Sequence, residues 1–222
     1  MSDFLDSVQI GPADATHSIV WLHGLGADGH DFEPIVPELR LPSDLRVRFV
    51  FPHAPARPIT LNNGYVMPAW FDIADLDRNA AVDHEGFTET RAAITQLIER
   101  EIERGVPSER IVLAGFSQGG AIALDLGLRL EQKLAGIMGL STFMLDDLRA
   151  ELPARPVNAA TPFFVAHGEQ DPVVPLALGE NSRDWLVEQG IDVEWHSYAM
   201  PHSVCMEEIA DISQWLQKLL RS

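Results

Sequence analysis

The sequence has one cysteine, few basic residues and no long apolar run, and each shortage excludes a class of protein. The lone Cys205 rules out an intrachain disulfide and favours a reducing compartment. Lys and Arg number 16 against 33 Asp and Glu, a formal net charge of −17, and a field of that sign repels nucleic acids and anionic membranes. No stretch approaches the roughly 18 apolar residues of a membrane-spanning helix, and the N-terminus lacks the regions of a signal peptide. We therefore expect a cytoplasmic protein without nucleic-acid partners or stable membrane insertion.

What remains is an ordinary globular composition. Of the 222 residues, 46% are apolar and 22% are charged, which excludes a disordered chain because enough apolar surface is present to offset the entropy of folding. The sequence contains no repeat, low-complexity tract or change of composition. We therefore expect one domain over residues 1–222.

Short apolar runs alternate with amphipathic stretches along the chain. The run lengths suit strands buried on both faces of a parallel sheet, and these strands are expected at residues 19–22, 46–51, 111–114, 136–140, 162–166 and 193–198. Helices are expected at residues 89–104, closed by Gly105, at 121–130 and at the C-terminus. The alternation predicts an α/β fold with a mostly parallel sheet and ligands at the carboxyl ends of its strands. Residues 52–80 fit no regular element, and we expect a functional loop there.

One of these strands runs directly into the sequence Gly115-Phe116-Ser117-Gln118-Gly119. This is the G-x-S-x-G pattern of a nucleophile elbow, a tight strand-to-helix turn that exposes a serine hydroxyl. The glycines two residues either side are needed where a Cβ would collide with neighbouring backbone. The alternative is a glycine-rich turn in which the serine caps a helix. The preceding strand and the apolar helix behind it favour Ser117 as a nucleophile.

The elbow predicts an acid and then a histidine, each after a later strand. Asp171 follows the strand at 162–166, with Glu169 as its nearest rival and a turn or helix-capping role as its alternative. His202 follows the strand at 193–198 and is the predicted base, unless it is simply the first residue of a helix. The oxyanion requires main-chain N–H donors, for which we predict Gln118 and, in the loop after the first buried strand, Leu25.

Other features point to different chemistry. Residues 24–29 form a G-x-G-x-x-G run after a strand, which raises dinucleotide binding as an alternative of another class. The next strand lacks the acidic residue that such a site uses for the ribose, and the glycines are followed by a polar stretch with a proline. No metal-ligand spacing occurs among the eight histidines, so no metal site is expected. Cys205 lies three residues after His202 and is expected to share its helix face and to pack rather than to react.

Several sequence blocks together resemble one known family. The blocks LHGLGADGHDF, PITLNNGYVMPAWFDI, AGFSQGGAIAL, HGEQDPVVP and YAMPHSV are similar to those of the carboxylesterase and acyl-protein thioesterase (lysophospholipase-like) family of α/β-hydrolases. The resemblance spans nearly the whole chain and implies an α/β-hydrolase fold without a separate lid domain. It implies the same catalytic and oxyanion residues and places Trp70 beside the acyl pocket. The stretch 141–148 departs from the family pattern, in which a proline more often follows the strand.

The sequence therefore predicts a serine hydrolase that forms an acyl-enzyme from a small ester or thioester substrate without any cofactor. Carboxylesterase activity is the main expectation, with acyl-protein thioesterase or lysophospholipase activity as the alternative and a non-catalytic binding module as a further one. A homodimer is left open. The acyl pocket is expected to use Met67, Trp70, Phe71 and Phe143. On this interpretation Trp70→Ala would change chain-length preference more than stability.

Overall fold

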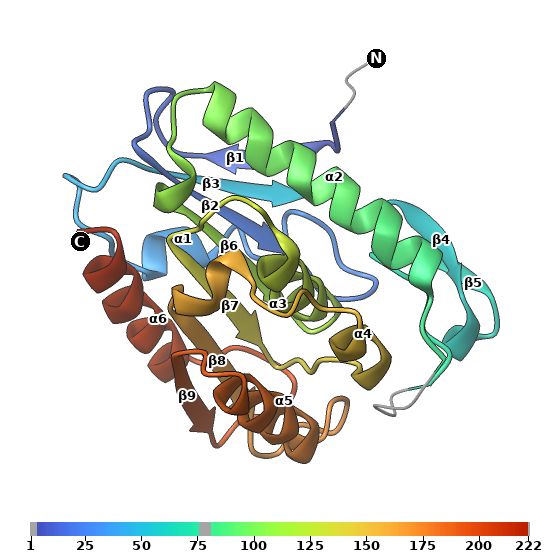
Figure 1. The fold of residues 1–222 in the computed structure, drawn as a ribbon. Helices are drawn as coiled ribbons and strands as arrows, with labels where there is room; N and C mark the ends of the chain where they lie inside the picture. The colour runs from blue at the N-terminus through green and yellow to red at the C-terminus, as the bar shows by residue number, and fades with distance from the viewer. Residues whose placement is uncertain (1–3, 76–80, 222) are drawn as a thin grey trace.

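The computed structural model describes residues 4–75 and 81–221. Within them lies a seven-stranded sheet with the order β1-β3-β2-β6-β7-β8-β9 (Figure 1). The strands are β1 (Ser7–Ile10), β2 (His17–Leu22), β3 (Val47–Pro52), β6 (Ile111–Phe116), β7 (Gly136–Leu140), β8 (Phe163–Gly168) and β9 (Val193–Tyr198). Each strand runs parallel to its neighbours except β1, which pairs antiparallel with β3. The carboxyl ends of the parallel strands therefore share one edge of the sheet.

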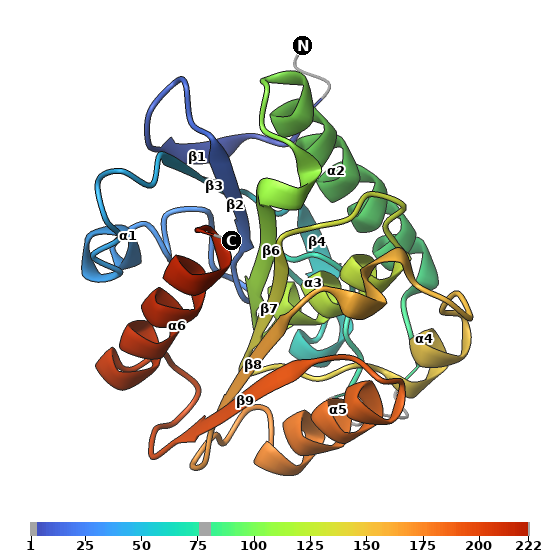
Figure 2. The same ribbon diagram turned by 60° about the vertical axis from the view of Figure 1, so that its left-hand side comes forward.

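Helices cover both faces of this sheet, as Figure 2 shows. One face carries α2 (His84–Glu103), α3 (Gln118–Arg129), α4 (Asp146–Ala150) and α5 (Leu176–Glu188), and the other carries α1 (Ile35–Glu38) and α6 (Met206–Leu219). Short 3-10 turns lie at Thr60–Asn62, Ser108–Arg110 and Val157–Ala160. Alternate residues of a strand serve opposite cores, so Val20 packs in one core and Ile19 in the other. This double burial explains why the inner strands, from β3 to β8 in the sheet, read as continuous apolar runs. The strand expected at 193–198 is different, because β9 lies at the edge of the sheet and is mostly half-buried or exposed.

The predicted fold class is confirmed, and the differences concern individual elements. Helix α2 begins at His84 rather than residue 89, because the Asp83 side chain accepts the Gly86 N–H at 2.9 Å and caps it. The short edge strand β1 was not predicted. The expectation of no regular element over residues 52–80 was wrong, since β4 (Ala56–Ile59) and β5 (Tyr65–Pro68) form an antiparallel hairpin there. Residues 76–80 of that stretch lie outside the described residues.

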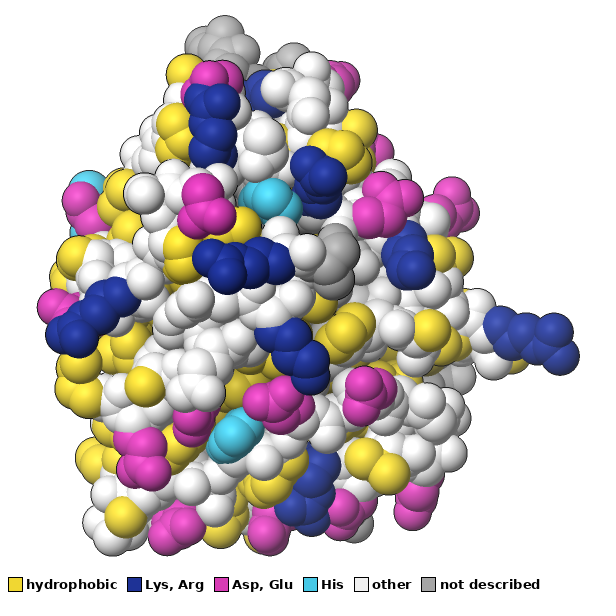
Figure 3. Space-filling view, turned by 90° about the vertical axis from the view of Figure 1, so that its left-hand side faces the viewer, with side chains coloured by type: hydrophobic (Ala, Val, Ile, Leu, Met, Phe, Trp, Pro, Cys, Tyr) yellow, Lys and Arg dark blue, Asp and Glu magenta, His cyan; other side chains and the backbone are white. Residues whose placement is uncertain are grey.

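Charge is mixed on the face that bears α6 and the C-terminus. Acidic and basic side chains are interspersed there with apolar ones (Figure 3), so on this face the net negative charge is not gathered into one patch. Among the described residues, no helix has the length and hydropathy needed to cross a membrane.

One buried acid makes the stability of the fold depend on pH. Glu208, in the first turn of α6, is fully buried, and this burial raises its pKa to about 8, with a further increase from the charge of Asp211 and a partial offset from the Cys205 main chain. Between its ordinary pKa of 4.5 and about 8, the folded protein holds a proton that the unfolded chain has lost. The free energy of unfolding therefore falls as pH rises through this range, by about 1 kcal/mol per pH unit from this group.

We expect Glu208→Gln to remove that contribution. Urea unfolding at several pH values between 5 and 8 (roughly the window set by the two pKa values) should show the variant gaining stability relative to the native protein as pH rises. Glu207→Gln, on the exposed neighbouring residue, is the matched control and should leave the difference flat. A constant difference between Glu208→Gln and the native protein across the range would contradict a protonated Glu208.

Candidate active site

Ser117 lies at the tight turn between β6 and α3. Its backbone has φ 52° and ψ −118°, a region that a residue with a side chain seldom adopts. A Cβ on Gly115 would lie 2.2 Å from the Gly119 carbonyl oxygen, and one on Gly119 would lie 2.5 Å from the His23 carbonyl oxygen. Glycine at both positions therefore lets the strand, the helix and the neighbouring loop approach closely enough to hold the serine in this conformation.

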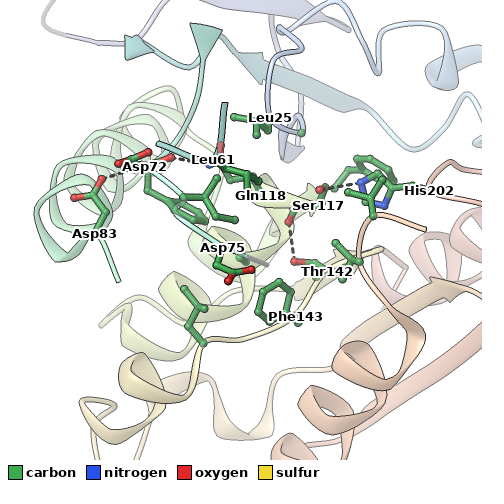
Figure 4. A pocket seen from close by; sticks show the side chains of 18 of the residues that line it. Leu25, Leu61, Asp72, Asp75, Asp83, Ser117, Gln118, Thr142, Phe143 and His202 are labelled. Carbon is green, nitrogen blue, oxygen red and sulfur yellow. Dashed lines mark hydrogen bonds between the residues drawn. The ribbon is translucent and has the colours of Figure 1, made fainter. Parts of the chain in front are cut away.

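Three side chains from three strand ends form a hydrogen-bonded chain. The Ser117 Oγ lies 2.9 Å from His202 Nε2, and His202 Nδ1 lies 2.6 Å from Asp171 Oδ2 (Figure 4 shows the first of these contacts). The other carboxylate oxygen of Asp171 accepts the N–H groups of Val173 and Val174, each at 2.8 Å. The carboxylate is thus fixed from one side and leaves Oδ2 for the imidazole. A serine facing an oriented imidazole in this way can be activated as a nucleophile.

The rival acid, Glu169, lies away from the imidazole, and a second histidine, His167, lies near Asp171. Glu169 is exposed and accepts the Ser197 hydroxyl at 3.0 Å. His167 is fully buried, and its Nε2 lies 2.8 Å from the Val174 carbonyl oxygen and 3.6 Å from Asp171 Oδ2. Burial lowers the pKa of His167 and keeps its ring neutral. The Asp171 carboxylate therefore lies beside two histidines. His202 contacts Ser117, and His167 contacts the Val174 carbonyl oxygen in the turn after Asp171.

Cys205 does not share a helix with His202. Cys205 is the residue directly before α6, which begins at Met206, and its side chain makes no capping hydrogen bond, whereas His202 lies in the loop before it. The expected helical spacing between the two was wrong because the chain remains extended at Cys205, with φ −107° and ψ 166°. Cys205 is partly buried against the core beneath α6.

The residues predicted to bind the oxyanion both face the space around Ser117. Leu25 and Gln118 line the same cavity as the serine and the histidine (Figure 4). Among the described residues, no acceptor takes the main-chain N–H of either one. Both groups are therefore available to a ligand. The glycine run at residues 24–29 is not followed by a helix of useful length, since α1 has four residues and begins at Ile35, and this arrangement does not suit dinucleotide phosphates.

The loop that carries Leu25 is held from within by His23. The buried ring of His23 accepts the Ala54 N–H at Nε2, over 3.1 Å, so its proton sits on Nδ1 and is donated to the Gly24 carbonyl oxygen at 2.7 Å. Burial lowers the pKa of His23, which keeps the neutral form that this arrangement needs. His23 was not singled out from the sequence, although its place directly after β2 was an available signal.

A cavity of about 300 Å³ opens beside the serine. Its walls are mostly apolar, and the side chains that supply them include Leu25, Leu61, Phe71, Ile73, Val82, Phe116, Ala121, Phe143, Leu145, Val173 and Val174. Phe71 and Phe143 are thus where the sequence predicted them. Acidic side chains also reach the cavity, at Asp31, Asp72, Asp75 and Asp83. The arrangement suits an apolar chain whose reactive carbon lies at Ser117.

Trp70 and Met67 do not line this cavity, contrary to the expectation from sequence. Trp70 is fully buried, and its indole N–H donates to the His23 carbonyl oxygen at 2.8 Å. The centres of the Trp70 and His23 rings lie 5.0 Å apart. Its main-chain N–H donates to Gln118 Oε1 at 2.8 Å, and Gln118 Nε2 donates to the Phe71 carbonyl oxygen at 2.7 Å. Met67 lies on β5, where its sulfur is within 3.5 Å of Asn62 Nδ2. Trp70 therefore supports the cavity from behind.

Trp70→Ala is accordingly expected to lower the free energy of unfolding by about 3–5 kcal/mol, as truncation of a large buried aromatic does. The variant should also hydrolyse esters of short and long acyl chains more slowly by the same factor, because the Trp70 side chain contacts His23 and does not line the cavity proposed for the acyl chain. Urea unfolding and relative rates on a series of p-nitrophenyl esters check both points. Phe143→Ala, on the cavity wall, is the comparison and should change the ratio of long-chain to short-chain rates. A changed ratio in Trp70→Ala would return Trp70 to the acyl site.

The whole chain is similar to known proteins. A model described as Phospholipase/Carboxylesterase matches residues 5–220. The chain belongs to the phospholipase/carboxylesterase family. Acyl-protein thioesterase 1 of Neurospora crassa is 43% identical over 220 residues, covering 94% of this chain and 90% of that protein. The acyl-protein thioesterase 1 of Yarrowia lipolytica is 40% identical over 217 residues, covering 95% of this chain and 96% of that protein.

Solved structures that are similar to this chain have the same fold. Arabidopsis thaliana SOBER1 superposes with a TM-score of 0.84 at 31% identity, covering 92% of this chain and 99% of that one. Zea mays acyl-protein thioesterase 2 gives 0.83 at 28% identity, covering 98% and 100%. This family member is therefore an α/β-hydrolase and an enzyme of the ester and thioester hydrolase type, and the resemblance of its sequence blocks is confirmed.

Proposed function

We propose that this enzyme removes acyl groups from protein thiols, with Ser117 as nucleophile, His202 as general base and Asp171 as the acid that orients the base. The observation that carries the proposal is the hydrogen-bonded chain from Ser117 through His202 to Asp171 at the mouth of an apolar cavity. The relatives' names favour the thioester over the oxygen ester. The preference is therefore the reverse of the one drawn from sequence, in which carboxylesterase activity came first.

The geometry supports the following course of reaction. His202 Nε2 takes the proton of Ser117 as its Oγ attacks the acyl carbonyl, and Asp171 stabilises the charged imidazole through Nδ1. The negative oxygen that develops is held by the Leu25 and Gln118 N–H groups. Collapse breaks the carbon–sulfur bond, His202 gives its proton to the departing sulfur, and the thiol leaves while the acyl group stays on Ser117. His202 then accepts a proton from water as the water attacks the acyl-enzyme, and returns that proton to Ser117 Oγ as the acid is released.

The proposal is tested with one peptide in two forms, acylated on cysteine through sulfur or on serine through oxygen. Octanoyl and palmitoyl versions of each are supplied, and kcat/KM is measured for the native enzyme and for Ser117→Ala. We expect the native enzyme to cleave the S-acyl peptides faster than their O-acyl counterparts. We expect Ser117→Ala to cleave neither form. Faster cleavage of the O-acyl peptides would instead make the enzyme a carboxylesterase, and no cleavage of either form would overturn the proposal.

A further inference from the structure

A buried threonine outside the elbow motif contacts the elbow directly. Thr142 lies just beyond the carboxyl end of β7, and the register pairs Phe116 with Leu140, which brings the residues after the two strands side by side. Thr142 is 2% exposed, and its hydroxyl donates to the Ser117 carbonyl oxygen at 2.7 Å (Figure 4). The bond therefore joins the loop after β7 to the turn after the neighbouring strand β6.

The bonded carbonyl belongs to the peptide unit that carries the Gln118 N–H. A trans peptide is planar, and its C=O and N–H point in opposite directions. Fixing the Ser117 oxygen therefore fixes the direction of the Gln118 N–H, which points away from Thr142. A hydrogen bond accepted at the oxygen also polarises the unit and makes its N–H a stronger donor. The Ala121 N–H reaches the same oxygen at 3.1 Å from within α3, and Thr142 adds a shorter bond from outside the helix.

The other proposed oxyanion donor is held in the same manner. The Leu25 N–H shares its peptide unit with the Gly24 carbonyl, which accepts the Nδ1–H of His23 at 2.7 Å. His23 and Thr142 are both buried, with 2% of each residue exposed. The two N–H groups thus belong to peptide units whose oxygens are each bound by a buried side chain.

We propose that Thr142 is a positioning residue of the oxyanion hole, which acts through the Ser117–Gln118 peptide. The inference rests on the proposed role of the Gln118 N–H in the reaction. A packing role is the competing explanation, because Thr142 lines the cavity and its methyl carbon is 2.8 Å from where a Cβ on Gly120 would lie. The two explanations differ in which part of the side chain matters, the hydroxyl or the methyl group.

Two substitutions separate these parts. Thr142→Val keeps the shape and loses the hydroxyl, whereas Thr142→Ser keeps the hydroxyl and loses the methyl group. Removal of a whole oxyanion donor costs about 10²–10³ in rate, and misdirecting one that remains present should cost less, about 10-fold in kcat. We expect Thr142→Val to show this loss with KM and the chain-length profile unchanged, and Thr142→Ser to stay within about two-fold of the native enzyme.

The inhibition constant of a tetrahedral inhibitor separates the two explanations, because a loss of packing alone would leave it unchanged. An alkylboronic acid forms an adduct on the serine that mimics the negative oxygen, so its inhibition constant should rise in Thr142→Val by the same factor as kcat falls. Thr161→Val is the matched control. Thr161 is a buried threonine before the amino end of β8, whereas the active site lies at the carboxyl ends of the strands, and its hydroxyl donates to Asn158 Oδ1 at 2.8 Å. It should lose stability in urea unfolding and keep both kcat and the inhibition constant.

The contrary results are distinct. Unchanged kcat in Thr142→Val, an equal loss in Thr142→Ser, or a loss confined to KM of long chains would each overturn the positioning role. These results require turnover that depends on Ser117. If the native enzyme and Ser117→Ala hydrolyse the substrate equally, the proposed function itself fails, whatever Thr142 does.

Discussion

Ser117→Ala will lower kcat by about 10⁶-fold, the scale seen when the nucleophile of a serine hydrolase is removed. The expectation follows from the 2.9 Å contact with His202 Nε2 and from the turn that holds the hydroxyl at the cavity mouth. Without the hydroxyl no acyl-enzyme can form, and the remaining groups can only assist direct attack by water. Initial rates on a p-nitrophenyl ester and on an S-acyl peptide, each at saturating substrate, measure the loss.

Ser141→Ala is the matched control for that variant. Ser141 is buried and also has a positive φ, of 46°, and among the described residues its hydroxyl has no hydrogen-bond partner. Its removal should therefore leave kcat within about two-fold, because no interaction is lost. Retention of more than about 1% of native kcat by purified Ser117→Ala would exclude Ser117 as the nucleophile, since general-base assistance alone does not supply such rates.

Asp171→Asn should lower kcat by about 10⁴-fold, as the equivalent change does in other serine hydrolases. The reason lies in the contacts of the carboxylate. Its Oδ1 accepts two main-chain N–H groups, from Val173 and Val174, so an asparagine would place its oxygen there and turn its NH₂ group toward His202. The imidazole must then accept at Nδ1 and carry its proton on Nε2, which faces Ser117 and cannot take the serine proton.

The rival carboxylate provides the control for Asp171. Glu169→Gln changes an exposed side chain that contacts Ser197 rather than the imidazole, and it should leave kcat within about two-fold. Both variants are assayed on the same p-nitrophenyl ester across a range of pH, with urea unfolding to verify that they are folded. A larger loss in Glu169→Gln than in Asp171→Asn would exchange the roles of the two carboxylates.

The sequence predicts those parts of the enzyme that depend on local pattern. The strands at residues 19–22 and 111–114 are visible as apolar runs because both of their faces are buried. The order of Ser117, Asp171 and His202 follows from their places after the strands β6, β8 and β9, and the structure brings the three side chains into one hydrogen-bonded chain. Parallel strands put their carboxyl ends at one edge, so position along the sequence translates directly into proximity there.

The sequence does not reveal the direction in which a side chain points, nor the contacts that arise from the alignment of neighbouring strands. Trp70 is recognisably an apolar aromatic, but its indole turns toward the His23 carbonyl rather than into the cavity. The hairpin of β4 and β5 was hidden because its strands are short and each contains a proline. Thr142 reaches Ser117 through the alignment of β6 with β7, which no local pattern encodes. Glu208 gives no sign in the sequence of being a buried acid.

Rapid-quench mass spectrometry tests directly whether Ser117 carries the acyl group during thioester hydrolysis. The native enzyme is mixed with an S-octanoyl peptide, quenched in acid before one turnover is complete, and digested for peptide mapping. We expect one octanoyl group on Ser117, and none in Ser117→Ala. An octanoyl group on Cys205, or sustained turnover by Ser117→Ala, would contradict it.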